Sequence, residues 1–116
     1  MKYIAIDGDD VGRLITYCYF NENESRLKML SAALNDIVIE ISEHLKRCGF
    51  ETIFCAADGI TAKTESDIDY IKLFNEIKLI AYEPFTFSVG VADSLKDVYI
   101  ALMDAKCNGK NTIRIY

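Results

Sequence analysis

Two short acidic stretches contain the residues best suited to bind a metal ion. Residues 7–10 (Asp-Gly-Asp-Asp) follow the apolar run of residues 2–6, and residues 56–59 (Ala-Ala-Asp-Gly) separate two further apolar runs. Carboxylates at the ends of neighbouring strands suit Mg²⁺, a hard cation that prefers oxygen ligands. Two such ions can hold the attacking and leaving oxygens of a phosphoryl transfer. We therefore expect Asp7 and Asp58 to form one catalytic metal site.

Other residues of the first stretch could complete this site. The Gly8 carbonyl could be a ligand, because glycine lets the backbone approach closely. Asp9 could bind the metal and Asp10 could lie beside a bound nucleotide. Asp is also a common helix N-cap, so the stretch taken alone favours a surface turn that caps a helix.

Two lysines near the C-terminus could bind phosphate. Lys106 and Lys110 flank Asn108-Gly109 at the expected end of a helix, from which they could reach the phosphates of a nucleoside triphosphate. Lysines at that position also complement the helix dipole, which is the simpler interpretation. The other candidate nucleotide-binding residues are small or flexible: Gly8, Gly12, Ala57, Gly59 and Ser88.

The net charge limits the class of ligand. The chain has 13 Lys and Arg against 18 Asp and Glu, a formal charge of −5. General nucleic-acid binding depends on neutralised phosphates, so we do not expect it here. The sequence contains no apolar run of membrane-spanning length and no signal-peptide pattern at its start. We therefore expect a soluble, cytoplasmic protein without direct membrane binding.

The cysteines and the single histidine do not suggest a zinc site. The four cysteines are scattered and form no CxxC pair, and His44 is the only histidine. Structural zinc sites usually need clustered thiols or several histidines. We expect His44 to be a surface or half-buried helix residue.

The secondary-structure pattern predicts one domain over residues 1–116. Apolar residues at steps of three and four define a long amphipathic helix over residues 25–48, which Gly49 would end. Residues 51–56 and 59–64 read as a hairpin around a short acidic turn. The other expected elements are strands at 2–6, 84–92 and 112–116, and helices at 11–20, from a Ser66–Asp69 capping box to 81, and from a Ser94–Asp97 capping box to 109.

This order of elements predicts an α+β, ferredoxin-like palm. Its antiparallel-rich sheet would have the helices packed on one face. The first strand and the hairpin can lie side by side in such a sheet, which would bring Asp7 and Asp58 together.

Four segments in order resemble a known family. IAIDGDDVGRLI is similar to the first acidic motif of the polymerase/cyclase palm in type III CRISPR signalling subunits. FCAADGITA lies where that family has its GGDD hairpin and diguanylate cyclases have GGDEF. FSVGVADS and DAKCNGKNTIRIY resemble the closing part of both families. The minimal length points to the stand-alone minimal CRISPR polymerase (mCpol) domains, which are associated with anti-phage signalling.

The resemblance implies a reaction and roles for individual residues. The family joins nucleoside triphosphates into cyclic di- or oligonucleotides with Mg²⁺ or Mn²⁺, for a downstream effector that responds to the product. The resemblance to the CRISPR branch implies ATP as the substrate here. Asp7, Asp9 and Asp58 take the positions of metal-binding acids, and Gly8 that of a carbonyl ligand. The phosphate-contacting basic residues correspond to Lys106 and Lys110.

Three residues depart from the family pattern. Ala56 and Ala57 replace the glycine pair of the hairpin, and Gly59 stands where a second acid is usual. We interpret the chain as a divergent but competent cyclase. The alternatives are a degenerate palm that binds or senses a nucleotide, and a regulatory domain whose acidic turns only cap helices.

A cyclase of this kind needs two nucleotides in proximity. The chain has a single palm, so we expect a homodimer with two-fold symmetry. Apolar residues outside the regular stripes could form its contact, or they could lie in one large core: Tyr17, Tyr19, Phe20, Met29 and Ile39.

Overall fold

The computed structural model describes residues 1–116 as a mixed α+β domain, which confirms the expected fold class. The helices and strands lie close to the predicted ranges, and none of the helices is both long enough and apolar enough to cross a membrane. In chain order the elements are β1 (Lys2–Gly8), α1 (Val11–Phe20), α2 (Glu24–Arg47), β2 (Glu51–Ala56), β3 (Gly59–Thr64), α3 (Tyr70–Ile80), β4 (Phe87–Ala92), α4 (Leu95–Cys107) and β5 (Ile113–Ile115).

The five strands form one sheet with the order β2-β3-β1-β4-β5. β1 lies at its centre and pairs antiparallel with both β3 and β4, whereas β4 and β5 are parallel. In this register Asp7 is opposite Gly59 on one side and Ser88 on the other. The predicted adjacency of the first strand and the hairpin is therefore present.

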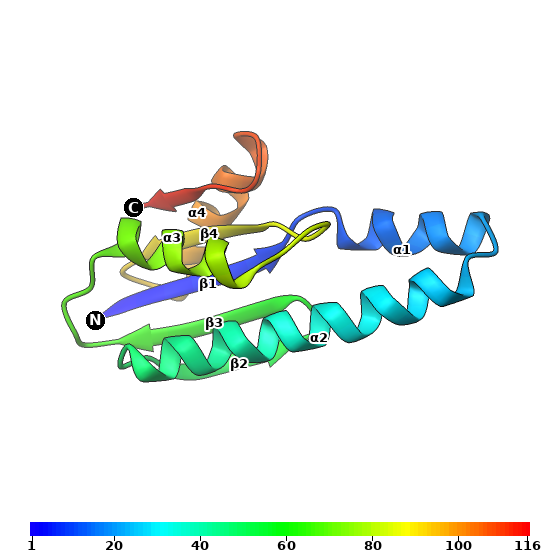
Figure 1. Ribbon diagram of the computed structural model, residues 1–116. Coiled ribbons are helices and arrows are strands. Elements are labelled where there is room, and N and C mark those ends of the chain that lie inside the picture. The colour runs from blue at the N-terminus through cyan, green and yellow to red at the C-terminus, as the bar shows by residue number, and fades with distance from the viewer.

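The helices cover both faces of the sheet, which corrects the expectation of a single covered face. Ile4 and Ile6 of β1 belong to the main core, which also contains residues of α2 and α3. The residue between them, Ala5, packs with Val98 and Leu102 of α4. Figure 1 shows α2 and α3 in front of the sheet and α4 behind it. The β4–α4–β5 crossover therefore carries α4, with Lys106, to the face opposite the long helix.

Gly90 explains why α4 can lie so close to β4. A Cβ atom at this position would collide with backbone atoms of Leu102, Val98 and Ala101. The missing side chain lets the helix backbone contact the strand directly. Gly90 therefore positions α4, and with it Lys106, relative to β1.

Helix α1 and the first half of α2 extend beyond the end of the sheet (Figure 1). The domain is elongated as a result, with extents of 46 × 28 × 22 Å. The apolar residues that could have enlarged the core are exposed instead, with Phe20 84 % and Tyr19 67 % accessible. All five residues considered for the dimer contact are exposed: Tyr17, Tyr19, Phe20, Met29 and Ile39.

One helix start differs from the sequence prediction. Helix α3 is capped by Asp69, whose side chain accepts a hydrogen bond from the Lys72 N–H at 3.1 Å. Ser66 lies three residues before this N-cap and does not cap the helix, and its N–H donates to the Thr64 hydroxyl. The Ser94 hydroxyl caps α4 as predicted, accepting from the Asp97 N–H at 3.1 Å.

Candidate active site

The end of β1 and the β2–β3 turn meet at two carboxylates. The Gly8 N–H donates to the Asp58 carbonyl oxygen at 3.1 Å, which ties the turn to β1. A Cβ atom on Gly8 would lie only 2.8 Å from Oδ2 of Asp58. Glycine at this position therefore leaves the space that the Asp58 carboxylate fills. The structure brings Asp7, Gly8 and Asp58 together, as the sequence predicted.

Asp7 is poorly placed to carry a negative charge without a cation. Burial raises the pKa of its carboxyl group above the ordinary value, and repulsion from Asp58 raises it further. The ammonium of Lys106, 3.2 Å from Oδ2 of Asp7, offsets part of this effect. A bound cation would relieve the same repulsion, because it favours the charged form of nearby carboxylates.

The Lys106 ammonium lies among oxygen atoms at the centre of the site. Its Nζ donates to the Gly8 carbonyl at 2.7 Å and to Oδ1 of Asp9 at 2.9 Å. The Asp7 carbonyl is 3.3 Å away. These oxygens are the ligand type that Mg²⁺ prefers, and here they surround a positive charge. The donor set therefore fits a hard cation.

Asp9 is a buried carboxylate that accepts four hydrogen bonds. Its Oδ1 accepts from the Ser88 hydroxyl at 2.6 Å and from Lys106. Its Oδ2 accepts from the Thr86 hydroxyl at 2.8 Å and from the Asn111 N–H at 2.9 Å. Burial opposes ionisation, but these bonds outweigh it and lower the pKa of Asp9. Asp9 thereby links β1, β4 and the turn after α4.

Of three further predicted nucleotide-binding residues, Ser88 joins this network, whereas Gly12 and Lys110 do not contact Asp9. The Ser88 hydroxyl donates to Asp9, and Ser88 is fully buried. Gly12 lies on an exposed side of α1, with open space where a Cβ would be. Lys110 makes a 2.6 Å ion pair with Asp10, and this hydrogen bond lowers the pKa of Asp10.

Asp10 occupies the N-cap position of α1, but its side chain makes no capping hydrogen bond. The carboxylate binds Lys110 instead. The simple capping interpretation of residues 7–10 therefore does not describe Asp10. The first N–H groups of α1 receive no cap from its side chain.

The altered hairpin keeps a geometry suited to glycine at one position. Ala57 has a φ of 51°, in the left-handed region that L-residues rarely adopt. Gly59 does not have a positive φ, so its backbone does not require glycine. A Cβ there would lie 3.4 Å from Oδ1 of Asp7, an ordinary contact. The backbone of Ala57 is therefore strained. At Gly59, the space that a side chain would occupy next to Asp7 is empty.

A cavity of about 390 Å³ opens beside Asp9 and Asp10. The sequence reasoning missed most of its lining, although Arg13 lies one helical turn after Asp10. Thr86 was missed as well, because only the sheet register places it beside Asp9. The cavity is lined by Asp9, Asp10, Arg13, Leu14, Tyr17, Pro84 and Thr86.

The sequence model of the minimal CRISPR polymerase domain matches residues 3–116, and the chain belongs to this family. No curated protein matches the sequence. Among solved structures, the chain is similar to one from Caldicellulosiruptor saccharolyticus described as a diguanylate cyclase/phosphodiesterase. The TM-score is 0.59 at 21 % identity, over 99 % of this chain and 75 % of the other. At that identity the likeness shows the shared fold alone.

Proposed function

We propose that this member of the minimal CRISPR polymerase family is a metal-dependent nucleotidyltransferase that makes a cyclic di- or oligonucleotide from nucleoside triphosphates. The observation that carries the proposal is the juxtaposition of Asp7 and Asp58 with Lys106 beside them. The raised pKa of Asp7 means that its ionised form is disfavoured without a metal, and a bound cation would stabilise that form.

Asp7, Asp58 and the Gly8 carbonyl would hold Mg²⁺ or Mn²⁺. Such ions would stabilise charge on the reacting phosphate oxygens and lower the pKa of the attacking hydroxyl. Asp9 is not free to bind a metal in the arrangement described, because both its oxygens are engaged. We assign Asp9 to positioning Lys106 and the turn after α4, in place of the ligand role that the resemblance implies.

Lys106 and Lys110 are the basic residues available to a triphosphate. Lys106 is largely buried and contacts the Gly8 carbonyl, so it would exchange that contact for a phosphate oxygen when a metal binds. Lys110 is more exposed and its only ion-pair partner is Asp10, whose side chain is also exposed. Charge-assisted contacts to phosphate at these positions would orient the triphosphate towards the metal-binding acids.

The competing function is a palm that binds a nucleotide without converting it. The observation in its favour is Gly59, which leaves the position next to Asp7 without the second acid. That change removes one carboxylate but retains Asp58. Two carboxylates and a carbonyl remain for metal binding, which is why we favour the enzyme.

The proposal extends to substrate, assembly and biological setting. ATP is the substrate suggested by the resemblance to the CRISPR branch, and the product would act on a cyclic-nucleotide-responsive effector in anti-phage defence. A homodimer would bring two nucleotides together, and the exposed apolar residues of α1 offer a contact surface. Nucleoside triphosphates are intracellular metabolites, so we place the reaction in the cytoplasm.

Mass spectrometry tests the proposed reaction. The protein is incubated with each nucleoside triphosphate in Mg²⁺ or Mn²⁺, and Asp58→Asn is the matched variant. A cyclic product made by the wild type and lost in Asp58→Asn supports the enzyme. Nucleotide binding by calorimetry without any product supports the sensor, and equal product from both proteins contradicts the assignment of Asp58.

A further inference from the structure

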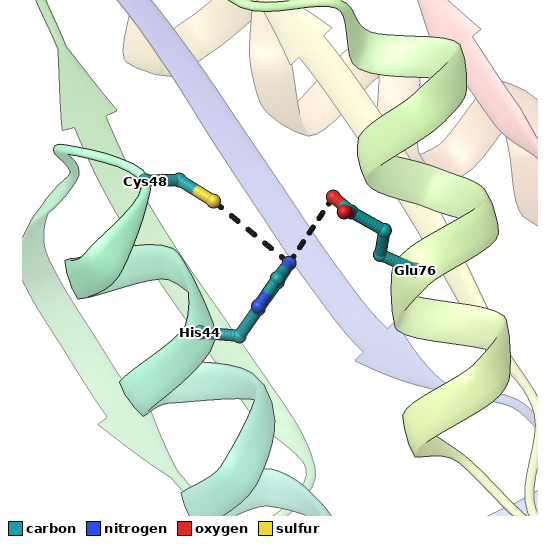
Figure 2. A group of neighbouring side chains, drawn as sticks. All are labelled: His44, Cys48 and Glu76. Atoms are coloured by element: carbon teal, nitrogen blue, oxygen red, sulfur yellow. Dashed lines mark hydrogen bonds and ion pairs between the residues drawn. The ribbon is translucent and has the colours of Figure 1, made fainter.

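A second group of metal-ligand side chains lies between α2 and α3. His44 and Cys48 are one helical turn apart at the end of α2, and Glu76 faces them from α3. Figure 2 shows the sulfur and the carboxylate converging on the imidazole ring from opposite sides. The Thr64 hydroxyl donates to the carbonyl of Gly49, which directly follows Cys48. Thr64 also pairs with Lys2, the first residue of β1. The group is therefore at the far end of β1 from Asp7.

We propose that His44, Cys48 and Glu76 bind a zinc-type transition-metal ion. Each offers one ligand atom, and the three atoms lie within 4.8 Å of one another. The sequence argument against zinc considered only His and Cys. It missed the site because Glu76 comes from a different helix. The His-x-x-x-Cys spacing on α2 was the local signal.

The distances are close to those of tetrahedral coordination. Nε2 of His44 is 3.2 Å from Oε1 of Glu76 and 3.8 Å from Sγ of Cys48. Typical zinc bond lengths at tetrahedral angles place ligand nitrogen and oxygen about 3.3 Å apart, and nitrogen and sulfur about 3.6 Å apart. The sulfur and carboxylate are the atoms that must approach each other. The Glu76 side chain can do so, because it is long and 36 % exposed.

A proton on His44 does not satisfy all three groups. If Nε2 carries a proton, it donates to the Glu76 carboxylate and the thiol finds no acceptor there. If Nε2 is unprotonated, it accepts from the thiol and the carboxylate finds no donor there. A metal ion in place of the proton interacts with all three ligand atoms at once.

The charges and ligand types select the ion. A neutral imidazole, a thiolate and a carboxylate carry two negative charges, which one divalent cation neutralises. The thiol releases its proton to solvent when the metal binds. An imidazole and a thiolate suit zinc far better than Mg²⁺, which prefers oxygen. His44 and Cys48 also lie at the C-terminus of α2, where the helix dipole favours a cation.

Three protein ligands leave the fourth coordination position to a water molecule. The site would join the end of α2 to the middle of α3, two helices that otherwise meet through apolar packing on one face of the sheet. Bound metal stabilises the state that binds it, so the ion would raise the melting temperature of the domain.

Cobalt substitution tests the site directly. The full chain, reduced with a phosphine and freed of metal by a chelator, is titrated with Co²⁺ in excess Mg²⁺. We expect one Co²⁺ per chain, a thiolate-to-cobalt charge-transfer band, and displacement by Zn²⁺. Cys48→Ser should lose the band. Cys107→Ser, which removes an exposed thiol outside the cluster, should keep it.

Glu76→Gln separates a metal site from a simple ion pair and leaves the thiol in place. We expect zinc affinity to fall at least about tenfold, and the zinc-dependent rise in melting temperature to shrink. No cobalt–thiolate band in the wild type would overturn the proposal. So would a band that persists in Cys48→Ser, or equal zinc affinity in the wild type and Glu76→Gln.

Discussion

Replacing Asp9 by asparagine tests whether this residue supports the fold or serves as a free metal ligand. The substitution removes a charge and changes one oxygen into an NH₂ group, which can donate but cannot accept. If the NH₂ replaces Oδ1, it faces the Lys106 ammonium; if it replaces Oδ2, it faces the Asn111 N–H. Neither partner can accept a hydrogen bond, so no orientation of the amide satisfies the site.

The expected cost follows from these contacts. Lys106 and Asn111 can only donate, so the variant loses the hydrogen bond to whichever of them faces the NH₂ group. The other of the two still donates to the amide oxygen, but that acceptor is no longer ionised. Hydrogen bonds to charged groups contribute about 1.5–3 kcal/mol each. One such bond is lost outright and a second is only weakened, so we expect a cost of about 2–4 kcal/mol. That is a substantial part of the roughly 5–15 kcal/mol by which a domain is stable.

Urea unfolding followed by far-ultraviolet circular dichroism, without metal, measures this cost. Asp58→Asn is the matched control, because its carboxylate makes no hydrogen bond within the chain and lies near Asp7. We expect that control to be as stable as the wild type or more stable, since it relieves repulsion between two acids. A free energy of unfolding for Asp9→Asn within about 1 kcal/mol of the wild type would refute the reasoning.

Four further predictions concern the hairpin, the phosphate contact and assembly. Ala57→Gly should raise the free energy of unfolding by up to about 1 kcal/mol, because left-handed strain outweighs the entropy of glycine; a lower melting temperature would contradict this. Gly59→Asp should fold, because its Cβ has room, but a further acid beside Asp7 should lower the metal-free melting temperature and make it depend more on Mg²⁺; an unfolded variant would contradict the observed backbone. Lys110→Ala should weaken calorimetric binding of ATP far more than that of adenosine, and equal losses would assign Lys110 to the helix end alone. If the enzyme works as a dimer, specific activity should fall on dilution below the dissociation constant while light scattering shows dissociation, whereas a monomer of constant specific activity would exclude the dimer model.

Local patterns predicted the elements well because each signal acts within a few residues. The apolar period of residues 25–48 predicts α2, which spans Glu24–Arg47. The local patterns do not predict which face of the sheet each helix covers. Every residue of β4 is buried, so its pattern does not distinguish the two faces. The available signal was residue size, since Ala5 and Gly90 lie on the face that α4 approaches.

Residue type predicted which acids meet but not how each is used. Asp7 and Asp58 follow from strand ends that the topology brings together. Asp9 has the same chemistry, but its partners Thr86 and Asn111 are 77 and 102 residues away. Asp9 accepts four hydrogen bonds and has a structural role, whereas Asp7 contacts only Lys106 and remains available to a cation. That difference depends on tertiary contacts, which no local pattern contains.

Charge in the acidic site shows why the structural role of Asp9 still matters for metal binding. Asp7, Asp9 and Asp58 as carboxylates carry three negative charges and Lys106 carries one positive charge, while Asp10 and Lys110 cancel. Two negative charges remain, the same excess that the proposed cluster of His44, Cys48 and Glu76 would carry once the Cys48 thiol has lost its proton. If both proposals hold, one divalent ion would neutralise each site, and ligand hardness would distinguish them. Oxygen ligands would favour Mg²⁺ at one end of β1, and sulfur and nitrogen would favour zinc at the other.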